Sequence, residues 1–145
     1  MKTVISKSPA ETVLLAEEFL NSKLNHIGKH ATIVPLYGDL GSGKTAFVQA
    51  LAKKLGVNET VSSPTFVIQK TYNTIHPIFQ KLIHIDAYRL KEGAELIHLR
   101  WEDISKDSKN LIVIEWPQRV EDILPKGTTP VHFKFVSENE REIQF

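Results

Sequence analysis

Apolar side chains near the N-terminus recur at the spacing of a helix. Ser8 is suited to cap this helix, Pro9 takes its first position, and Glu11 stands three residues after the cap. This combination favours a helix start. The apolar residues that follow at helical spacing are Val13, Ala16, Leu20 and Leu24. We therefore predict an amphipathic helix with one buried face.

Three short apolar runs are typical of buried strands. They cover residues 31–37, 81–85 and 111–114, and Asp86 and Glu115 directly follow the second and third runs. Runs of this length, rich in β-branched residues, match the strands of a mostly parallel sheet. Each of the last two strands is therefore predicted to end in a carboxylate.

A proline interrupts the first of these runs. Pro35 has no N–H to donate to a neighbouring strand. We expect it at a point where the strand needs no donor, or at a bulge.

Helical patterns separate the strands, and the C-terminus alternates between apolar and polar residues. Residues 43–55 carry apolar side chains on one side of a predicted helix, and residues 90–100 also have helical character. The alternation in 131–135 and 142–145, on either side of the polar turn 137–140, predicts a hairpin at the sheet edge.

Length and composition limit the architecture. The chain has 145 residues, 41% of them hydrophobic, which suits one domain with a substantial core. We expect a single three-layer α/β domain over residues 1–145, with a mostly parallel central sheet and helices on both faces. An antiparallel C-terminal hairpin forms one edge in this prediction.

Charge and residue types exclude several functional classes. The 18 basic and 17 acidic residues leave a net charge of +1, so composition indicates no nucleic-acid-binding face. The chain has no cysteine, which rules out disulfides and thiolate metal sites. No apolar stretch approaches the roughly 20 residues of a membrane span. We therefore predict a cytoplasmic protein that does not contact a membrane.

The segment GDLGSGKT lies between a predicted strand and a predicted helix. Gly38, Gly43, Lys44 and Thr45 match the pattern G-x-x-x-x-G-K-[ST]. Glycines allow successive backbone N–H groups to turn towards an anion, and the helix adds its positive end. The lysine reaches the β- and γ-phosphates, and the threonine hydroxyl is a ligand for Mg²⁺. The motif predicts a site for a nucleoside triphosphate with Mg²⁺.

The two strand-end carboxylates are expected beside this loop. In open α/β sheets, ligands bind beyond the carboxyl ends of the strands. Asp86 and Glu115 are therefore candidates for holding Mg²⁺ and for orienting the attacking water, and the sequence does not divide these roles. His84 alternates with the apolar residues of its strand and is interpreted as a structural histidine with its hydrogen bonds satisfied.

Four segments in order resemble the TsaE family, the small P-loop ATPases of bacterial tRNA threonylcarbamoyladenosine synthesis. The segments are GDLGSGKT, SPTF, HIDAYRL and EWPQRV, within residues 37–119. The resemblance implies a protein that binds ATP and Mg²⁺ and hydrolyses ATP slowly when alone. It also implies action on the TsaB and TsaD subunits, which modify adenosine 37 of tRNAs reading ANN codons. Contact with tRNA is expected to be indirect.

The resemblance also implies roles for individual residues. Thr45 and Glu115 are placed at Mg²⁺, and Asp86 near the γ-phosphate and its water. The residues placed around the nucleotide are Gly38, Asp39, Leu40, Gly41, Ser42, Gly43, Lys44, Thr45, Ala46, Ser63, Thr65, Trp116 and Arg119.

Within this set, Ser63 and Thr65 belong to a switch-like loop, and Arg119 is placed at the base end of the site. Ala46 is a departure, because the family usually repeats threonine there. The residues that contact adenine are left open, with Glu11 and Thr12 as candidates.

Two other functions remain as alternatives. A small-molecule kinase would use the same phosphate loop, but the chain has no arginine-rich lid segment and little room for an acceptor domain. An ATP-gated binding module would bind nucleotide with little turnover. A GTP switch is disfavoured because the chain has no N-K-x-D tetrapeptide.

Overall fold

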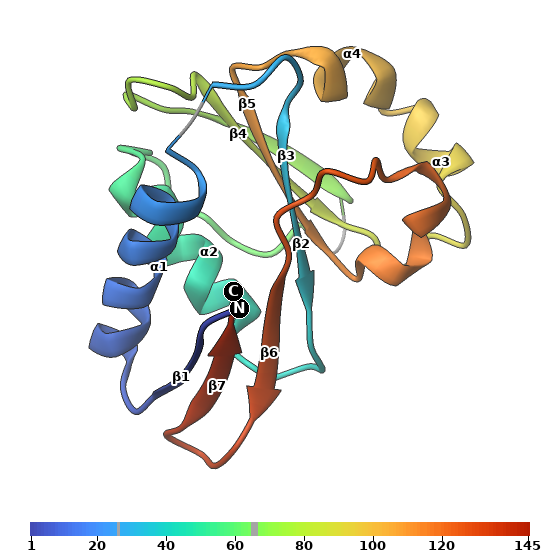
Figure 1. Ribbon diagram of the computed structural model, residues 1–145. Coiled ribbons are helices and arrows are strands. Elements are labelled where there is room, and N and C mark those ends of the chain that lie inside the picture. Colours follow the sequence, from blue (N-terminus) through green and yellow to red (C-terminus); the bar gives the residue numbers. More distant parts are fainter. Residues whose placement is uncertain (26, 65–66) are drawn as a thin grey trace.

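One seven-stranded sheet forms the centre of the molecule (Figure 1). The computed structural model describes residues 1–25, 27–64 and 67–145. The strands are β1 (Thr3–Ser6), β2 (Thr32–Tyr37), β3 (Gln69–Asn73), β4 (Lys81–Asp86), β5 (Asn110–Glu115), β6 (Val131–Phe135) and β7 (Arg141–Gln144). Their order in the sheet is β1-β7-β6-β2-β5-β4-β3, and the central strands β6, β2, β5 and β4 are parallel.

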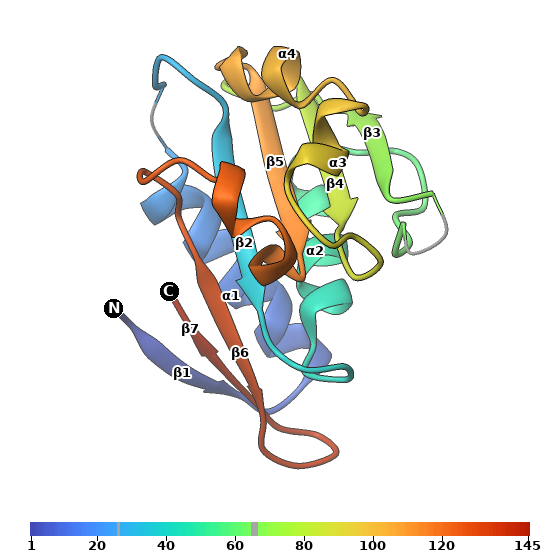
Figure 2. The ribbon, with the colours of Figure 1, turned by 90° about the vertical axis from the view of Figure 1, so that its right-hand side faces the viewer.

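Helices cover both faces of this sheet, as Figure 2 shows. The long helices α1 (Pro9–Lys23) and α2 (Lys44–Lys54) pack together on one face. The other face carries α3 (Ala94–Ile97), α4 (Trp101–Lys106) and the 3₁₀ turns η1 (Pro117–Arg119) and η2 (Glu121–Ile123). The predicted three-layer α/β fold is confirmed.

Successive side chains of the central strands pack alternately into two separate hydrophobic cores, one on each face of the sheet. Leu111 and Val113 of β5 join the core beneath α1 and α2, whereas Ile112 and Ile114 join the core beneath α3 and α4. Because successive side chains of a strand point to opposite faces, a strand buried on both faces reads as a continuous apolar run. This explains why these strands were recognisable in the sequence.

The start of α1 follows the predicted capping pattern. The Ser8 hydroxyl accepts a hydrogen bond from the Glu11 amide at 3.1 Å, and the Glu11 carboxylate accepts one from the Lys7 amide at 2.6 Å. Two otherwise unpaired amides are satisfied in this way. The helix start predicted at Pro9 is confirmed.

Pro35 lies inside β2 where no donor is required. The Ile33 carbonyl accepts from the Thr129 amide, so Ile33 and Pro35 both direct their backbone polar groups towards the β6 side. Strand β6 pairs with β2 only from Leu36 onwards, at Leu36 and Tyr37. The missing N–H therefore faces the segment that precedes β6, as the rule for proline in strands requires.

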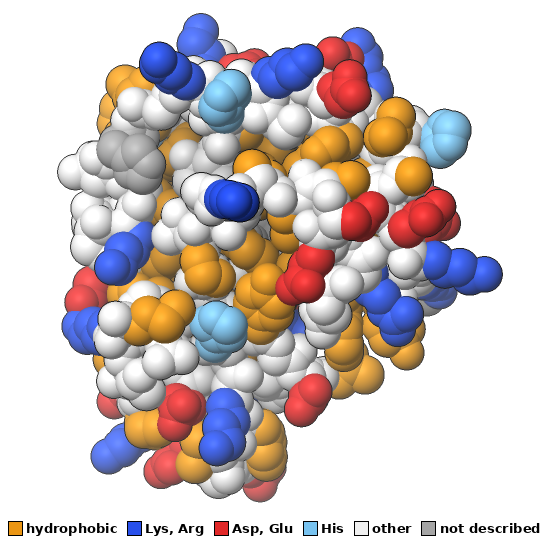
Figure 3. Space-filling view, turned by 45° about the vertical axis from the view of Figure 1, so that its right-hand side comes forward, with side chains coloured by type: hydrophobic (Ala, Val, Ile, Leu, Met, Phe, Trp, Pro, Cys, Tyr) orange, Lys and Arg blue, Asp and Glu red, His pale blue; other side chains and the backbone are white. Residues whose placement is uncertain are grey.

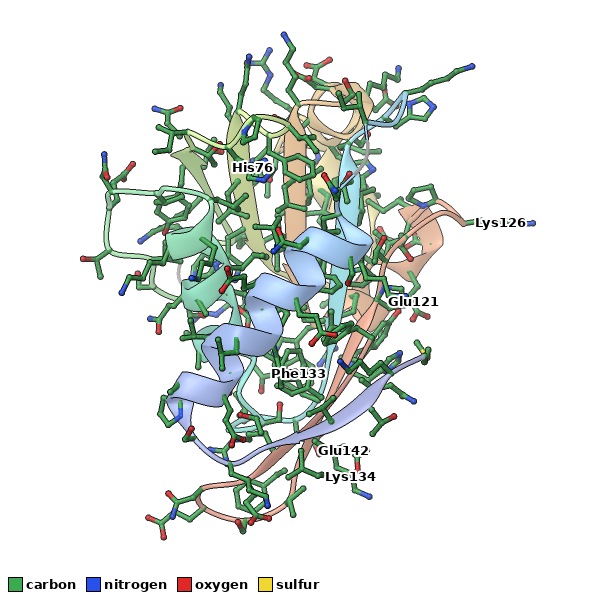
Figure 4. The ribbon with its side chains drawn as sticks, turned by 60° about the vertical axis from the view of Figure 1, so that its left-hand side comes forward. His76, Glu121, Lys126, Phe133, Lys134 and Glu142 are labelled. Atoms are coloured by element: carbon green, nitrogen blue, oxygen red, sulfur yellow. The ribbon has the colours of Figure 1, made fainter. Side chains whose placement is uncertain are left out.

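The C-terminal hairpin forms from β6 and β7, and an additional strand lies outside it. Strand β1 pairs antiparallel with β7, so β1 is the edge of the sheet and the hairpin is one strand further in. Lys134 and Glu142 are cross-strand partners in this hairpin (Figure 4). The two chain ends meet there, since the Lys2 amide donates to the Phe145 carbonyl.

Within the predicted helix 90–100, only residues 94–97 form an α-helix, which is α3, and α4 follows directly after residue 100. Arg100 has a left-handed backbone with φ of 64° and separates α3 from α4. Gly93 packs against η2, where its amide donates to Asp122 at 2.9 Å. The contact with η2 lies just before α3 begins, and the left-handed backbone of Arg100 ends the helical pattern before α4.

The outer surface has mixed charge. Figure 3 shows Lys and Arg side chains interspersed with Asp and Glu side chains on the face drawn there. Within the described residues, no helix has the length and apolar content needed to cross a membrane.

Candidate functional site

The carboxyl ends of β2, β5 and β4 form one edge of the sheet, and the glycine-rich loop begins there. Leu36 of β2 is opposite Glu115 of β5, and Glu115 is opposite Asp86 of β4. The loop leaves β2 after Tyr37 and enters α2 at Lys44. Parallel pairing therefore places both carboxylates beside the loop, as the sequence predicted.

Two glycines are required for the shape of this loop. Gly38 has φ of 152°, and a Cβ there would lie 2.7 Å from the Ser42 hydroxyl and 2.8 Å from the Phe133 carbonyl. Gly43 has φ of 104° in the left-handed region and leads directly into α2. Glycine is the residue that adopts such backbone angles without strain.

Several backbone amides of the loop form no hydrogen bond with the residues that the structure describes, although the Ser42 amide donates to the Asp39 carbonyl. No acceptor within the described part of the chain receives a hydrogen bond from the amides of Gly41, Gly43, Lys44 and Thr45. The Ser42 hydroxyl is also buried without a hydrogen-bond partner there. Buried or clustered donors of this kind are rarely left unpaired in a folded protein. Their arrangement at the start of α2 fits an anion such as a phosphate group.

The Lys44 side chain is held within the site. It is 5% exposed, donates a hydrogen bond to the Gly38 carbonyl, and places its ammonium 4.3 Å from the centre of the Trp116 ring. Burial lowers the pKa of Lys44, and the negative charges of Glu115 and Asp86 oppose this shift in part.

The two carboxylates have different surroundings. Asp86 accepts a hydrogen bond from the Tyr88 amide at 3.0 Å on Oδ1 and one from the Ser63 hydroxyl at 3.3 Å on Oδ2. The Oε2 atom of Glu115 lies 2.8 Å from Nε2 of His84. Both acidic side chains are buried, at 6% and 4% exposure.

A cleft of about 450 Å³ lies over the loop and these carboxylates. Most of the nucleotide-site residues predicted from the sequence line it. The lining residues are Leu40, Gly41, Gly43, Lys44, Thr45, Ala46, Ser63, Asp86, Glu115, Trp116 and Arg141. The structure therefore brings together the ends of β4 and β5, the start of β7, the glycine-rich loop with the start of α2, and the loop before β3.

The remaining predicted residues lie outside the lining of this cleft. Gly38 and Ser42 form the floor of the loop, and Asp39 is exposed. Arg119 is linked to the cleft through two aromatic side chains. Its guanidinium lies 5.9 Å from the centre of the Tyr88 ring, and the centre of the Tyr88 ring lies 5.2 Å from that of Trp116. Thr65 lies outside the described residues.

A second hollow of about 170 Å³ adjoins the cleft at Gly43, Ala46 and Arg141. It lies between the start of α1 and the β6–β7 turn. Its other lining residues are Ser6, Ser8, Pro9, Thr12, Glu138 and Asn139. Thr12, one of the two candidates for adenine contact, lines this hollow, whereas Glu11 does not.

Sequence reasoning missed the position of Arg141. Its guanidinium donates to the carbonyls of Ser137, Glu138 and Glu140, at 2.8 to 3.2 Å, and its side chain borders both hollows. The sequence shows it only as a polar residue at the start of a strand. No local pattern could indicate that the hairpin folds back next to the phosphate loop.

Comparison with known proteins places this geometry in a family. The family model described as "Threonylcarbamoyl adenosine biosynthesis protein TsaE" matches residues 6–143. The chain belongs to the TsaE family. The resemblance noted in four short segments is thereby confirmed over almost the whole chain.

Individual TsaE proteins show the same likeness. The chain is 35% identical over 118 residues to the tRNA threonylcarbamoyladenosine biosynthesis protein TsaE of Bacillus subtilis, covering 81% of this chain and 70% of that protein. It is 37% identical over 124 residues to the TsaE protein of Aquifex aeolicus, covering 79% and 87%.

A solved structure agrees with the TsaE assignment. The crystal structure of Bacillus subtilis YdiB superposes with a TM-score of 0.73 at 27% identity, covering 98% of this chain and 82% of YdiB. The family's role in tRNA threonylcarbamoyladenosine biosynthesis therefore applies to this chain, and its fold is that of a P-loop nucleotide-binding protein.

Proposed function

We propose that this TsaE protein binds ATP with Mg²⁺ and hydrolyses it in support of the TsaB and TsaD subunits. The proposed outcome is threonylcarbamoylation of adenosine 37 in tRNAs that read ANN codons. One observation carries the proposal: backbone amides that have no acceptor among the described residues lie at the start of α2 beside the buried Lys44. Such an arrangement matches the negative charge of a triphosphate.

The loop and Lys44 would do the work of positioning and neutralisation. The amides of Gly41, Gly43 and Lys44 would donate to phosphate oxygens. The Lys44 ammonium, now bonded to the Gly38 carbonyl, would reach the β- and γ-phosphates. Preorganised donors stabilise the charge that develops during phosphoryl transfer, because they need no reorientation as the reaction proceeds.

The surroundings of the two carboxylates support different roles. Oε1 of Glu115 has no hydrogen-bond partner among the described residues, whereas both oxygens of Asp86 accept hydrogen bonds. An oxygen without a partner is available to Mg²⁺, so we assign Glu115 and the Thr45 hydroxyl to the metal. Bound Mg²⁺ would supply charge neutralisation at the β- and γ-phosphates.

Asp86 would act on the water side of the reaction. The hydrogen bonds that it accepts from the Tyr88 amide and the Ser63 hydroxyl fix the direction of its carboxylate. A fixed carboxylate can orient a water molecule for attack on the γ-phosphate. Ser63 thereby connects the loop after α2 to the reacting end of the nucleotide.

The second hollow offers room for the ribose and base. It opens beside Gly43 and Ala46, at the end of the loop away from Asp86. Thr12 and Arg141 provide polar groups there, whereas Arg119 lines neither hollow. We therefore place the base end of the nucleotide between α1 and the hairpin turn.

The proposal is tested by measuring ATP turnover with purified protein, alone and with TsaB and TsaD, with and without Mg²⁺. We expect slow turnover alone, faster turnover with the two subunits, and none without the metal. Nucleotide-dependent binding to TsaB and TsaD without turnover would instead indicate a binding module. Transfer of the γ-phosphate to a small acceptor would indicate a kinase.

A further inference from the structure

We propose that His84 is a positioning residue, which holds the Glu115 carboxylate in the direction needed to bind Mg²⁺. The inference rests on the proposed function, in which Glu115 is a metal ligand. His84 itself lies beneath the cleft and does not line it. It would act only through the hydrogen bond between Nε2 and the Oε2 atom of Glu115.

Strand pairing brings the two side chains together from positions 31 residues apart. His84 of β4 is opposite Val113 of β5. Two residues further along the same strands, Asp86 is opposite Glu115. All four side chains point to the same face, because the period of a strand is two residues. His84 and Glu115 are therefore diagonal neighbours on adjacent strands. Long side chains in such positions can reach each other.

Chemistry determines which atom donates in this pair. A carboxylate only accepts hydrogen bonds, so the Nε2 atom of His84 carries the proton. The Nδ1 atom is buried and has no partner among the described residues. A proton on Nδ1 would be a buried donor without an acceptor among these residues, so the tautomer with its proton on Nε2 fits this site.

The unpaired Nδ1 argues against a purely structural role. His84 is 0% exposed, and Leu82 and Val113 on its face belong to the apolar core. Its other cross-strand neighbour, Lys70 of β3, donates a hydrogen bond to the Ser62 hydroxyl. The sequence interpretation of His84 as a fully satisfied structural histidine is wrong for this nitrogen. An apolar side chain at this position would avoid the burial of an unpaired nitrogen. What the histidine adds is one hydrogen bond, to Glu115.

This hydrogen bond has a defined effect on the carboxylate. It occupies Oε2 and restricts rotation of the carboxylate group, so Oε1 is left for a ligand in the cleft. Partners that orient metal-binding side chains typically contribute 10- to 100-fold to metal affinity. His84 is therefore expected to affect Mg²⁺ more than the nucleotide itself.

Two substitutions of similar polarity separate this role from simple packing. In His84→Gln the amide nitrogen occupies about the place of Nε2 and can still donate to Glu115. In His84→Asn the amide nitrogen occupies about the place of Nδ1 and cannot reach it. The experiment measures ADP affinity by calorimetry with and without Mg²⁺, and takes the ratio of the two dissociation constants for each protein.

We expect wild type and His84→Gln to bind ADP more tightly with Mg²⁺, and His84→Asn to lose about tenfold or more of this metal effect. Affinity for ADP without Mg²⁺ should be similar in all three proteins. A loss of packing would instead lower thermal stability without changing the ratio. An unchanged ratio in His84→Asn would overturn the inference while leaving the proposed function intact. If Mg²⁺ has no effect on ADP binding by the wild type, the inference and the assignment of Glu115 to the metal are both overturned.

A measurement on the wild-type protein covers the case in which His84→Asn does not fold. Nitrogen-15 spectra of the histidine rings report which ring nitrogen carries the proton. We expect one ring with a slowly exchanging Nε2 proton, because His84 is fully buried. A buried ring protonated at Nδ1 would contradict the hydrogen bond to Glu115 and overturn the inference.

Discussion

The ammonium of Lys44 lies over the indole ring of Trp116, 4.3 Å from its centre. Trp116 has a left-handed backbone with φ of 57°, directly after the metal-site candidate Glu115. A cation over an aromatic face is attracted by the ring, and this attraction strengthens when water is excluded. The lysine thus has a favourable position before any phosphate is bound, and a nucleotide would have to draw it away from the ring.

This relationship predicts a fluorescence signal. In a Trp101→Phe background, where Trp116 is the remaining tryptophan, ADP or ATP should change the emission of Trp116 because Lys44 moves towards phosphate. A titration of nucleotide checks this. Adenosine serves as the control, since it lacks phosphate and should leave the emission unchanged. Equal responses to adenosine and ATP would contradict the predicted movement of Lys44.

Removal of the Lys44 ammonium should weaken nucleotide binding. A hydrogen bond to a charged group contributes about 1.5–3 kcal/mol, so Lys44→Ala should raise the dissociation constant of ATP about 10- to 100-fold and abolish turnover. Calorimetry and a turnover assay measure these effects. The matched control is Lys53→Ala, an exposed lysine in the last turn of the same helix. Unaltered turnover in Lys44→Ala would refute the assignment of the phosphate loop.

The lowered pKa of Lys44 predicts a pH dependence of stability. Burial lowers this pKa below its ordinary value of 10.5. The unfolded chain therefore binds more protons between the two pKa values, and the free energy of unfolding contributed by this group rises with pH up to 10.5. Lys44→Met removes the contribution, so its stability should rise less with pH than that of wild type.

Urea unfolding of both proteins at a series of alkaline pH values measures the difference. At neutral pH the unliganded Lys44→Met protein should be the more stable of the two, since it buries no ammonium. Identical pH profiles would show that Lys44 is not desolvated in the folded protein.

Alanine substitutions at two glycines of the loop should destabilise the protein to different extents. At Gly38 a Cβ would meet the Ser42 hydroxyl at 2.7 Å and the Phe133 carbonyl at 2.8 Å, whereas at Gly41 the space is open and only the positive φ of 77° opposes a side chain. We expect Gly38→Ala to lose about 2–5 kcal/mol of stability and Gly41→Ala about 1–2 kcal/mol. Thermal unfolding of the two variants measures this, and equal losses would contradict the close packing at Gly38.

Neutralising Glu115 should reduce the dependence on Mg²⁺. Glu115→Gln keeps an oxygen that can accept from His84 and removes the negative charge, so the fold should persist. We expect the Mg²⁺ concentration for half-maximal turnover to rise about tenfold or more. A turnover assay over a range of Mg²⁺ concentrations checks this. Normal metal dependence in Glu115→Gln would move the metal role to Asp86.

Local sequence patterns predicted the elements whose structure depends on residues close together in the chain. Examples are the helix cap at Ser8, the continuous apolar runs of the strands buried on both faces, and the glycine-rich loop. The two strands missed, β1 and β3, have no strong pattern of their own, because one is short and the other, QKTYN, is mostly polar. They are stabilised by pairing with β7 and β4, partners that a local pattern does not reveal.

The sequence on its own specifies the phosphate site. Its residue types and their spacing are recognisable because one loop between a strand and a helix forms most of the site from consecutive residues. Tertiary structure alone decided what surrounds it: His84 against Glu115, Lys44 against Trp116, and Arg141 against the loop. These contacts join segments that lie 31, 72 or about 100 residues apart in the sequence. Strand order and the direction of side chains bring them together, and both depend on how the whole sheet assembles.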